Sequence, residues 1–162
     1  MKKFILFILL FATFSCDKDE PKPFSEQHSE QEVFNAIIGT WRPNRLAYDE
    51  NFKQIENTEN YPNWKKNNVI FNANNTTSTF VEWLDEDFQG SFYIEKEQQS
   101  NGRTDINIKY EGIIIYLSPT IYRTGGVIIH NYTDSTLIFS EVSHIKDGKS
   151  IPNLYSEFKR VK

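Results

Sequence analysis

The side chains best suited to chemistry in this chain are its three histidines and its single cysteine. A catalytic or zinc-binding histidine works with ligands at short, regular spacing or with acidic residues that converge on it. Here His28, His130 and His144 are far apart, and no two of them have the i, i+2 or i, i+4 spacing of a metal site. The sequence therefore predicts that all three are solvent-exposed or structural.

The acidic cluster Asp85-Glu86-Asp87 could in principle supply oxygen ligands to calcium. It lacks the glycine and the spaced glutamate of a loop that wraps the ion, so we interpret it as a solvated acidic turn. The sequence contains no Gly-x-Ser-x-Gly nucleophile motif, no phosphate-binding glycine loop and no second cysteine. We expect no metal, no cofactor and no enzymatic activity.

The single cysteine, Cys16, follows a segment with the layout of an export signal. Met1-Lys2-Lys3 provides positive charge, the run from Phe4 to Thr13 is apolar, and small Ser15 stands where a signal peptidase would cut. This run is too short to cross a bilayer, which takes about 20 apolar residues. The sequence predicts a signal peptide over residues 1–15.

A cysteine placed directly after the cut resembles the lipobox of bacterial lipoproteins. The resemblance implies acylation of Cys16, which then becomes the mature N-terminus and anchors the protein to the outer membrane, facing the periplasm or the cell surface. Acidic and lysine residues after it, such as Asp17-Lys18-Asp19, resemble the surface-export signals of some Gram-negative lipoproteins. The open alternatives are a cleaved signal peptide with an incidental cysteine and an uncleaved anchor.

The charge balance makes nucleic acid an unsuitable partner. The chain carries 22 Asp and Glu against 18 Lys and Arg, a net charge of −4. Binding to phosphate backbones needs clustered basic residues, and the clusters here are the pairs Lys65-Lys66 and Lys159-Arg160. We expect no nucleic-acid binding, which leaves a membrane, a small ligand or an envelope protein as partners.

A single globular domain is predicted over residues 29–162. The segment 16–28 before it is charged and contains prolines, so we interpret it as a flexible spacer. Ser29 and Glu32 have the spacing of a helix capping box, and apolar residues at helical spacing follow them before Gly39. This pattern predicts one short helix ahead of the first strand.

Beyond Gly39 the chain consists of short runs rich in Val, Ile, Thr, Tyr and Phe, separated by clusters of Asn, Asp, Gly and Pro. Short polar connectors favour an antiparallel meander, and closing the sheet would remove its exposed edges. The sequence therefore predicts an all-β fold, an antiparallel up-and-down β-barrel of about 8–9 strands with a short N-terminal helix. The predicted strands are Thr40–Tyr48, Asn68–Asn72, Thr77–Trp83, Gly90–Lys96, Asp105–Tyr110, Ile113–Leu117, Gly126–Asn131, Thr136–Val142 and Leu154–Val161.

The start of the first strand, Gly39-Thr40-Trp41, resembles the Gly-x-Trp opening of lipocalins. The order of the later strands is similar as well, and the chain resembles the small lipocalin-like lipoproteins of bacteria. In lipocalins a basic residue near the end of the last strand lies across the opening tryptophan. The resemblance therefore implies that Arg160 lies across Trp41 and closes one end of the barrel, a structural role for both residues.

Five aromatic residues in the predicted strands are candidates for lining the barrel interior. An eight-stranded barrel is either filled by side chains or holds one small ligand. We expect a tethered barrel that binds a small apolar molecule, oriented by a few polar groups. The alternative is a non-enzymatic structural or interaction lipoprotein with a filled barrel, which docks an envelope protein partner. The candidate pocket residues are Trp83, Phe92, Tyr110, Tyr116 and Phe139.

Two connections between strands carry further hypotheses. The long polar segment between Tyr48 and Asn68 contains Tyr61-Pro62-Asn63-Trp64, which either packs onto the barrel or forms a lid over it. Asp134-Ser135-Thr136 resembles a bacterial O-glycosylation site at Ser135, and we interpret it instead as an Asp-initiated turn between two strands.

Overall fold

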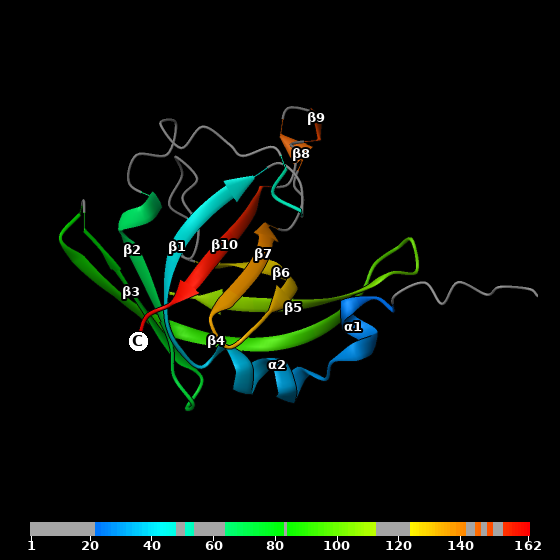
Figure 1. The fold of residues 1–162 in the computed structure, drawn as a ribbon, viewed down its shortest axis with the longest axis horizontal. Coiled ribbons are helices and arrows are strands. Elements are labelled where there is room, and N and C mark those ends of the chain that lie inside the picture. The colour runs from blue at the N-terminus through cyan, green and yellow to red at the C-terminus, as the bar shows by residue number, and fades with distance from the viewer. Residues whose placement is uncertain are drawn as a thin grey trace, which may run out of the picture.

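The computed structural model describes residues 22–47, 51–53, 64–82, 84–112, 124–141, 145–146, 149–150 and 154–162. Eight antiparallel strands close into an up-and-down barrel with the order β1-β10-β7-β6-β5-β4-β3-β2 (Figure 1). The predicted fold class is confirmed. The barrel strands are β1 Gly39–Ala47, β2 Asn67–Phe71, β3 Thr76–Val81, β4 Glu86–Gln98, β5 Thr104–Glu111, β6 Thr124–Tyr132, β7 Thr136–Glu141 and β10 Tyr155–Arg160.

The remaining described elements are small. Helices α1 (Phe24–Gln27) and α2 (Glu30–Ile37) precede the barrel, and the 3₁₀ turn η2 (Trp64–Lys66) leads into β2. Strands β8 (Ile145–Lys146) and β9 (Lys149–Ser150) pair with each other in the connection between β7 and β10.

Eight of the nine predicted strands correspond to the barrel strands, and the ninth, Ile113–Leu117, lies outside the described residues. Strand β4 is longer than predicted because it pairs with β3 over its first half and with β5 over its second, with Ser91 facing both Thr76 and Glu111. Its first residues, Glu86 and Asp87, are therefore part of a ladder. The prediction of an acidic turn was wrong for these two residues, although their side chains are exposed.

Helix α2 begins at the predicted capping box. The Ser29 hydroxyl accepts a hydrogen bond from the Glu32 backbone N–H, and the Glu32 carboxylate accepts one from the Ser29 N–H at 2.6 Å. Both bonds satisfy backbone donors at the helix start, and the bond from the Ser29 N–H, together with one from the Ser29 hydroxyl to the same carboxylate, holds the pKa of Glu32 below its usual range. The buried face of the helix carries Val33 and Ile37. The predicted helix ahead of the first strand is confirmed.

Helix α1 lies within the segment that we interpreted as a flexible spacer, and that interpretation was wrong for residues 24–28. The ring of Phe24 packs against His28 and edge-on against Tyr132 of β6. The Ser25 hydroxyl donates to the Thr104 carbonyl at 2.6 Å, and the Lys96 ammonium donates to the Ser25 carbonyl at 2.7 Å. One aromatic anchor and these bonds attach a charged, proline-containing segment to the barrel wall.

The topology separates two kinds of connection at the two ends of the barrel. At one end, which we call the helix end, three short turns over 72–75, 99–103 and 133–135 join the strands, and α2 leads into β1. The opposite end, which we call the loop end, carries the connections 48–66, 82–85, 112–123 and 142–154. Figure 1 shows α2 below the barrel and the end of β1 pointing away from it.

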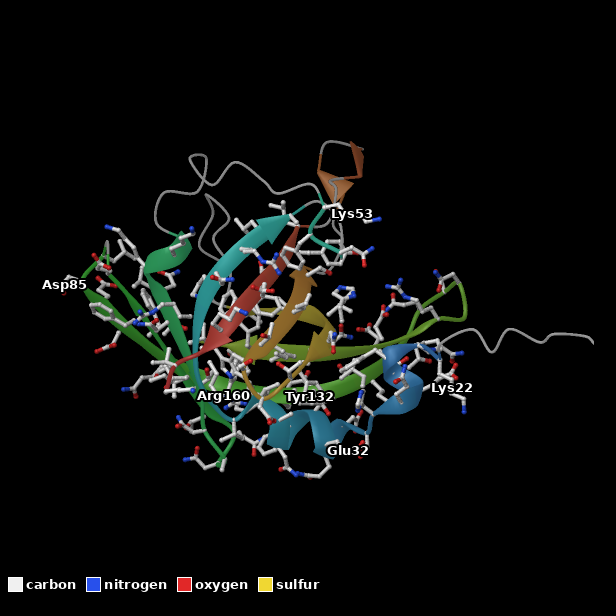
Figure 2. All side chains as sticks on the ribbon, viewed as in Figure 1. Lys22, Glu32, Lys53, Asp85, Tyr132 and Arg160 are labelled. Atoms are coloured by element: carbon white, nitrogen blue, oxygen red, sulfur yellow. The ribbon has the colours of Figure 1, made fainter. Side chains whose placement is uncertain are left out.

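Trp41 and Arg160 close the helix end. The indole of Trp41 is fully buried, and its N–H donates to the Ile37 carbonyl at 2.6 Å. The guanidinium of Arg160 lies 4.3 Å from the Trp41 ring centroid and donates to the carbonyls of Ala36, Ile38 and Asp134. This is the arrangement that the lipocalin resemblance implies, and Figure 2 shows Arg160 at the end of the barrel where α2 lies.

Gly39 makes room for that arrangement. Its φ of +132° lies in a region that L side chains rarely adopt, and a Cβ atom at this position would lie 2.5 Å from Nη1 of Arg160. The glycine of the Gly-x-Trp pattern therefore has a physical reason in this chain.

Candidate functional site

The inner wall of the barrel includes three polar side chains that have no hydrogen-bond partner among the described residues. Asn67 shares one face of β2 with Val69 and Phe71, because alternate residues of a strand point the same way. By the same alternation Thr79 shares a face with Val81 of β3, and Ser156 shares a face with Phe158 of β10. All the apolar residues of these faces belong to one buried core cluster, so the three polar side chains point into the barrel.

These three side chains are buried without hydrogen-bond partners. Asn67 is 1% exposed, and Thr79 and Ser156 are fully buried. Both amide atoms of Asn67, Oγ1 of Thr79 and Oγ of Ser156 have no partner among the described residues. A buried polar group without a partner costs about 1–3 kcal/mol, and native proteins satisfy most of them with protein or water. The four atoms therefore call for partners beyond the described residues.

A neighbouring residue on the same face shows the ordinary arrangement. Thr77 of β3 is equally buried, but its hydroxyl donates to the Ile70 carbonyl at 2.7 Å. Thr77 lies nearer the helix end, where β3 begins, and Thr79 lies one inward position closer to the loop end. The unpaired hydroxyl of Thr79 is therefore specific to its position and does not follow from burial of a threonine as such.

The surroundings of the three polar groups are apolar. Val81 is directly opposite Asn67 in the β2–β3 ladder, Val69 is opposite Thr79, and Ser156 faces both Leu46 and Phe139 across its two ladders. An apolar wall with a few unpaired polar groups has the composition of a small-molecule site, in which the apolar part gives affinity and the polar groups fix orientation.

Among the strand residues whose side chains the structure describes, no charged side chain is buried on an inward face. The two buried carboxylates, Asp105 and Glu157, lie on the outward faces of β5 and β10 and pair with Arg103 and Arg45. Burial alone would raise the pKa of Glu157, but hydrogen bonds from Arg45 and Asn44 outweigh it and hold that pKa below its usual range. The described side chains of the candidate site are therefore polar without being ionic.

The predicted pocket residues are distributed over the core. Phe92 stacks on Phe34 of α2 with ring centroids 5.5 Å apart and packs edge-on against Phe71, so it fills the helix end. Phe139 packs against Phe158 and lies beside Ser156, which places it at the candidate site. Trp83 and Tyr116 lie outside the described residues, as does the segment 61–63 of the proposed lid.

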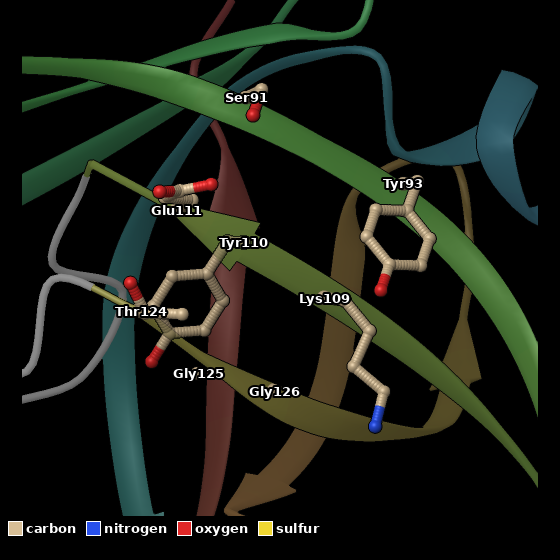
Figure 3. A pocket seen from close by; sticks show the side chains of 8 residues that line it. All are labelled: Ser91, Tyr93, Lys109, Tyr110, Glu111, Thr124, Gly125 and Gly126. Atoms are coloured by element: carbon tan, nitrogen blue, oxygen red, sulfur yellow. The ribbon is translucent and has the colours of Figure 1, made fainter.

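Tyr110, the fifth predicted pocket residue, is 7% exposed and belongs to the core cluster, on the same face of β5 as Ile106 and Ile108, and it also lines a groove beside β6 (Figure 3). A Cβ atom on Gly125 would lie 2.8 Å from the Tyr110 hydroxyl oxygen, so the ring fits there because residue 125 is glycine. The groove encloses about 420 Å³ on the face of β4, β5 and β6. Its cation, Lys109, is paired with Glu97 at 2.8 Å, and its Tyr93 is 55% exposed. The groove is an open surface feature with a neutralised charge.

Both described histidines have structural surroundings. His130 Nε2 hydrogen-bonds Ser140 Oγ at 2.8 Å, its ring packs on Tyr155, and burial, with help from the Arg103 charge, lowers its pKa to about 4. His28 Nδ1 lies 3.2 Å from the Tyr132 hydroxyl. Within the described part of the chain, no three His, Cys, Asp or Glu side chains are grouped as metal ligands. His144 lies outside the described residues.

The turn that contains Ser135 differs from the predicted one. Thr133, and not Asp134, supplies the side chain that organises it, because its hydroxyl accepts from the N–H groups of Ser135 and Thr136. The Asp134 carbonyl instead accepts from Arg160.

A scan against protein-family models and a search of curated proteins found no match to this chain. The geometry of the barrel therefore carries the functional argument by itself. None of the helices in the described ranges has the length and apolarity needed to cross a membrane.

Proposed function

We propose that this protein is a lipocalin-like barrel that binds one small, mainly apolar molecule in the half of its interior nearest the loop end. The observation that carries the proposal is the set of four unpaired polar atoms on Asn67, Thr79 and Ser156, all buried on a mainly apolar inner wall. A bound molecule with one polar group would satisfy several of them and would bury its apolar part against the same wall. The proposal includes no catalytic step.

The location of the polar groups agrees with entry from the loop end. The helix end is closed by Trp41, Arg160 and α2, whereas the long connections all lie at the opposite end. The interior of an eight-stranded barrel is just wide enough to be filled by side chains or to hold one small ligand, so we expect one bound molecule per barrel.

Binding of the neutral fluorescent probe N-phenyl-1-naphthylamine tests this proposal. We expect the purified protein to bind the probe and the variant Thr79→Phe to lose binding, because the added ring would occupy the site. Ser78→Phe is the matched control, since Ser78 directly precedes Thr79 in β3 and points outward. Thr79→Val keeps the volume and should retain binding, which separates a blocked site from a damaged fold. Absence of probe binding, or full binding by Thr79→Phe, would contradict the proposal.

The second part of the proposal is a membrane anchor on Cys16. The residue follows a signal-peptide pattern, and several acyl chains on one cysteine give stable attachment, at about 0.8 kcal/mol for each buried methylene. We place the anchored protein at the outer membrane, on its periplasmic or surface side.

The attachment of α1 orients the barrel on this anchor. Because Ser25 is bonded to the start of β5, the segment between Cys16 and α1 is only residues 17–23, which reach at most about 25 Å. The start of β5 lies at the helix end, so the loop end would face away from the membrane and toward ligands or partners in the aqueous compartment.

Fractionation of cells that express Cys16→Ala tests the anchor. We expect the variant to leave the membrane fraction, with Ser15→Ala as a control that keeps a small residue before the cut and stays attached. Unchanged membrane association of Cys16→Ala would contradict acylation as the anchor.

A further inference from the structure

We infer that the barrel selects ligands with an uncharged head group that both donates and accepts hydrogen bonds, such as a primary amide, in preference to carboxylates of the same chain length. The inference rests on the proposed ligand-binding function and specifies the chemistry of that same site.

Asn67 defines the head group. Its side chain offers one acceptor, Oδ1, and one donor, Nδ2, and both are unpaired at 1% exposure of the residue. A carboxylate has only acceptors, so it would satisfy Nδ2 and leave Oδ1 unpaired. A primary amide matches both atoms, with its N–H facing Oδ1 and its carbonyl facing Nδ2.

Thr79 is placed to contact the same head group. Asn67 pairs with Val81, and Val69 pairs with Thr79. Asn67 and Thr79 are therefore diagonal neighbours on the adjacent strands β2 and β3, and residues in this relation lie about 7–8 Å apart. A small polar group between them can reach both side chains. Ser156 lies on the far side of β1 and adds a hydroxyl to the same interior.

Four cations around the barrel are already engaged and are not free to neutralise an anionic head group. Arg160 lies at the closed end and donates to three backbone carbonyls, and Lys96 donates to the Ser25 carbonyl. Arg45 and Arg103 lie on the outer surface, each paired with a carboxylate. An ionised ligand would therefore lose its hydration on this wall without gaining a counter-ion, which is strongly unfavourable.

Competition against N-phenyl-1-naphthylamine tests the inference with three probes of one chain length at pH 7.5: decanamide, methyl decanoate and decanoate. The protein is used as its host cell processes it. We expect decanamide to displace the fluorescent probe at a concentration at least about tenfold lower than decanoate, because the carboxylate must be buried as an ion. Methyl decanoate, which is neutral and lacks a donor, should fall between them.

The variant Asn67→Leu should bind the fluorescent probe and lose the preference of decanamide over methyl decanoate. Asn68→Leu is the matched control, because Asn68 is the adjacent residue of the same strand, points outward and accepts from Arg42. Thr79→Val and Ser156→Ala, which remove one hydroxyl each, should weaken decanamide binding if Asn67→Leu does not fold.

The outcomes distinguish the proposed ligand binding from the inferred preference for an amide. If decanoate binds as tightly as decanamide, or if Asn67→Leu keeps the full preference for the amide, the inference is wrong while ligand binding stands. If none of the probes binds, the proposed function is wrong, and water is the partner of the unpaired atoms.

Discussion

The helix end and the loop end of this barrel differ in how completely their buried polar groups are hydrogen-bonded. At the helix end, the indole N–H of Trp41 and the guanidinium of Arg160 are all paired with backbone carbonyls, and the strands are joined by short turns. Toward the loop end, Asn67, Thr79 and Ser156 remain unpaired at equal burial. The helix end therefore holds the fold together. The loop end contains buried polar groups that lower stability when unpaired, and under our proposal a bound molecule supplies their hydrogen bonds.

The largest expected effect is the loss of the helix-end closure in Trp41→Ala. Removing a fully buried indole should lower the free energy of unfolding by about 3–5 kcal/mol. Urea unfolding measures it, with the exposed outer-face substitution Phe80→Ala as a control that should change stability by less than about 0.5 kcal/mol. A loss below about 1 kcal/mol for Trp41→Ala would mean that this tryptophan does not support the helix end.

Acid should destabilise the helix end through His130. The pKa of His130 is about 4 in the folded protein, below the usual histidine value of about 6.5 that holds in the unfolded chain, so between these limits the unfolded state binds a proton that the folded state lacks. Stability should therefore rise with pH across this window, by about 3 kcal/mol in total from this residue. Unfolding at pH 4.5 and pH 7 measures the slope, and His130→Gln should reduce it. Equal slopes in the two proteins would contradict a neutral, buried His130.

Loss of the guanidinium over Trp41 should have a smaller effect. Arg160→Lys keeps the positive charge but cannot form the planar, multiply bonded contact, so we expect a loss of about 2 kcal/mol. Lys159→Arg, on the adjacent outward position, is the control and should be neutral. If Arg160→Lys were equally neutral, the three carbonyl bonds would contribute nothing measurable.

The smallest expected effect is the difference in stability between two threonine variants of β3. Thr77→Val and Thr79→Val make the same change on the same face of β3, two residues apart. Thr77→Val should destabilise the protein by about 1 kcal/mol because it breaks the bond to Ile70, whereas Thr79→Val should be neutral or stabilising in the ligand-free protein. Equal losses in thermal or urea unfolding would show that Thr79 has a partner and that the two ends do not differ.

Much of the fold follows from local sequence patterns. Alternating apolar residues and polar connectors located the eight barrel strands, and Ser29 with Glu32 located the start of α2, because both signals act over a few residues. Helix α1 escaped prediction because its composition is that of a spacer, and only the contact of Phe24 with Tyr132, distant in sequence, orders it.

The candidate site could be predicted less well from the sequence than the fold. Aromatic residues suggested the pocket, yet Phe92 fills the helix end and the unpaired groups belong to Asn67, Thr79 and Ser156. Strand alternation could have placed all three inside, since Asn67 precedes Val69 by two residues and Ser156 precedes Phe158 by two. Whether a buried hydroxyl or amide has a partner depends on the neighbouring strands, however, and the pattern of one strand does not contain that information.

Native mass spectrometry of the protein purified from its own host is the decisive test of ligand binding, with residues 22–28 retained because α1 is part of the fold. We expect a noncovalent adduct of one small molecule per chain that leaves on denaturation and is reduced in Thr79→Phe but not in Ser78→Phe. A bare mass under gentle conditions, together with no uptake of N-phenyl-1-naphthylamine, would contradict the claim that the unpaired polar groups of the barrel interior serve a ligand.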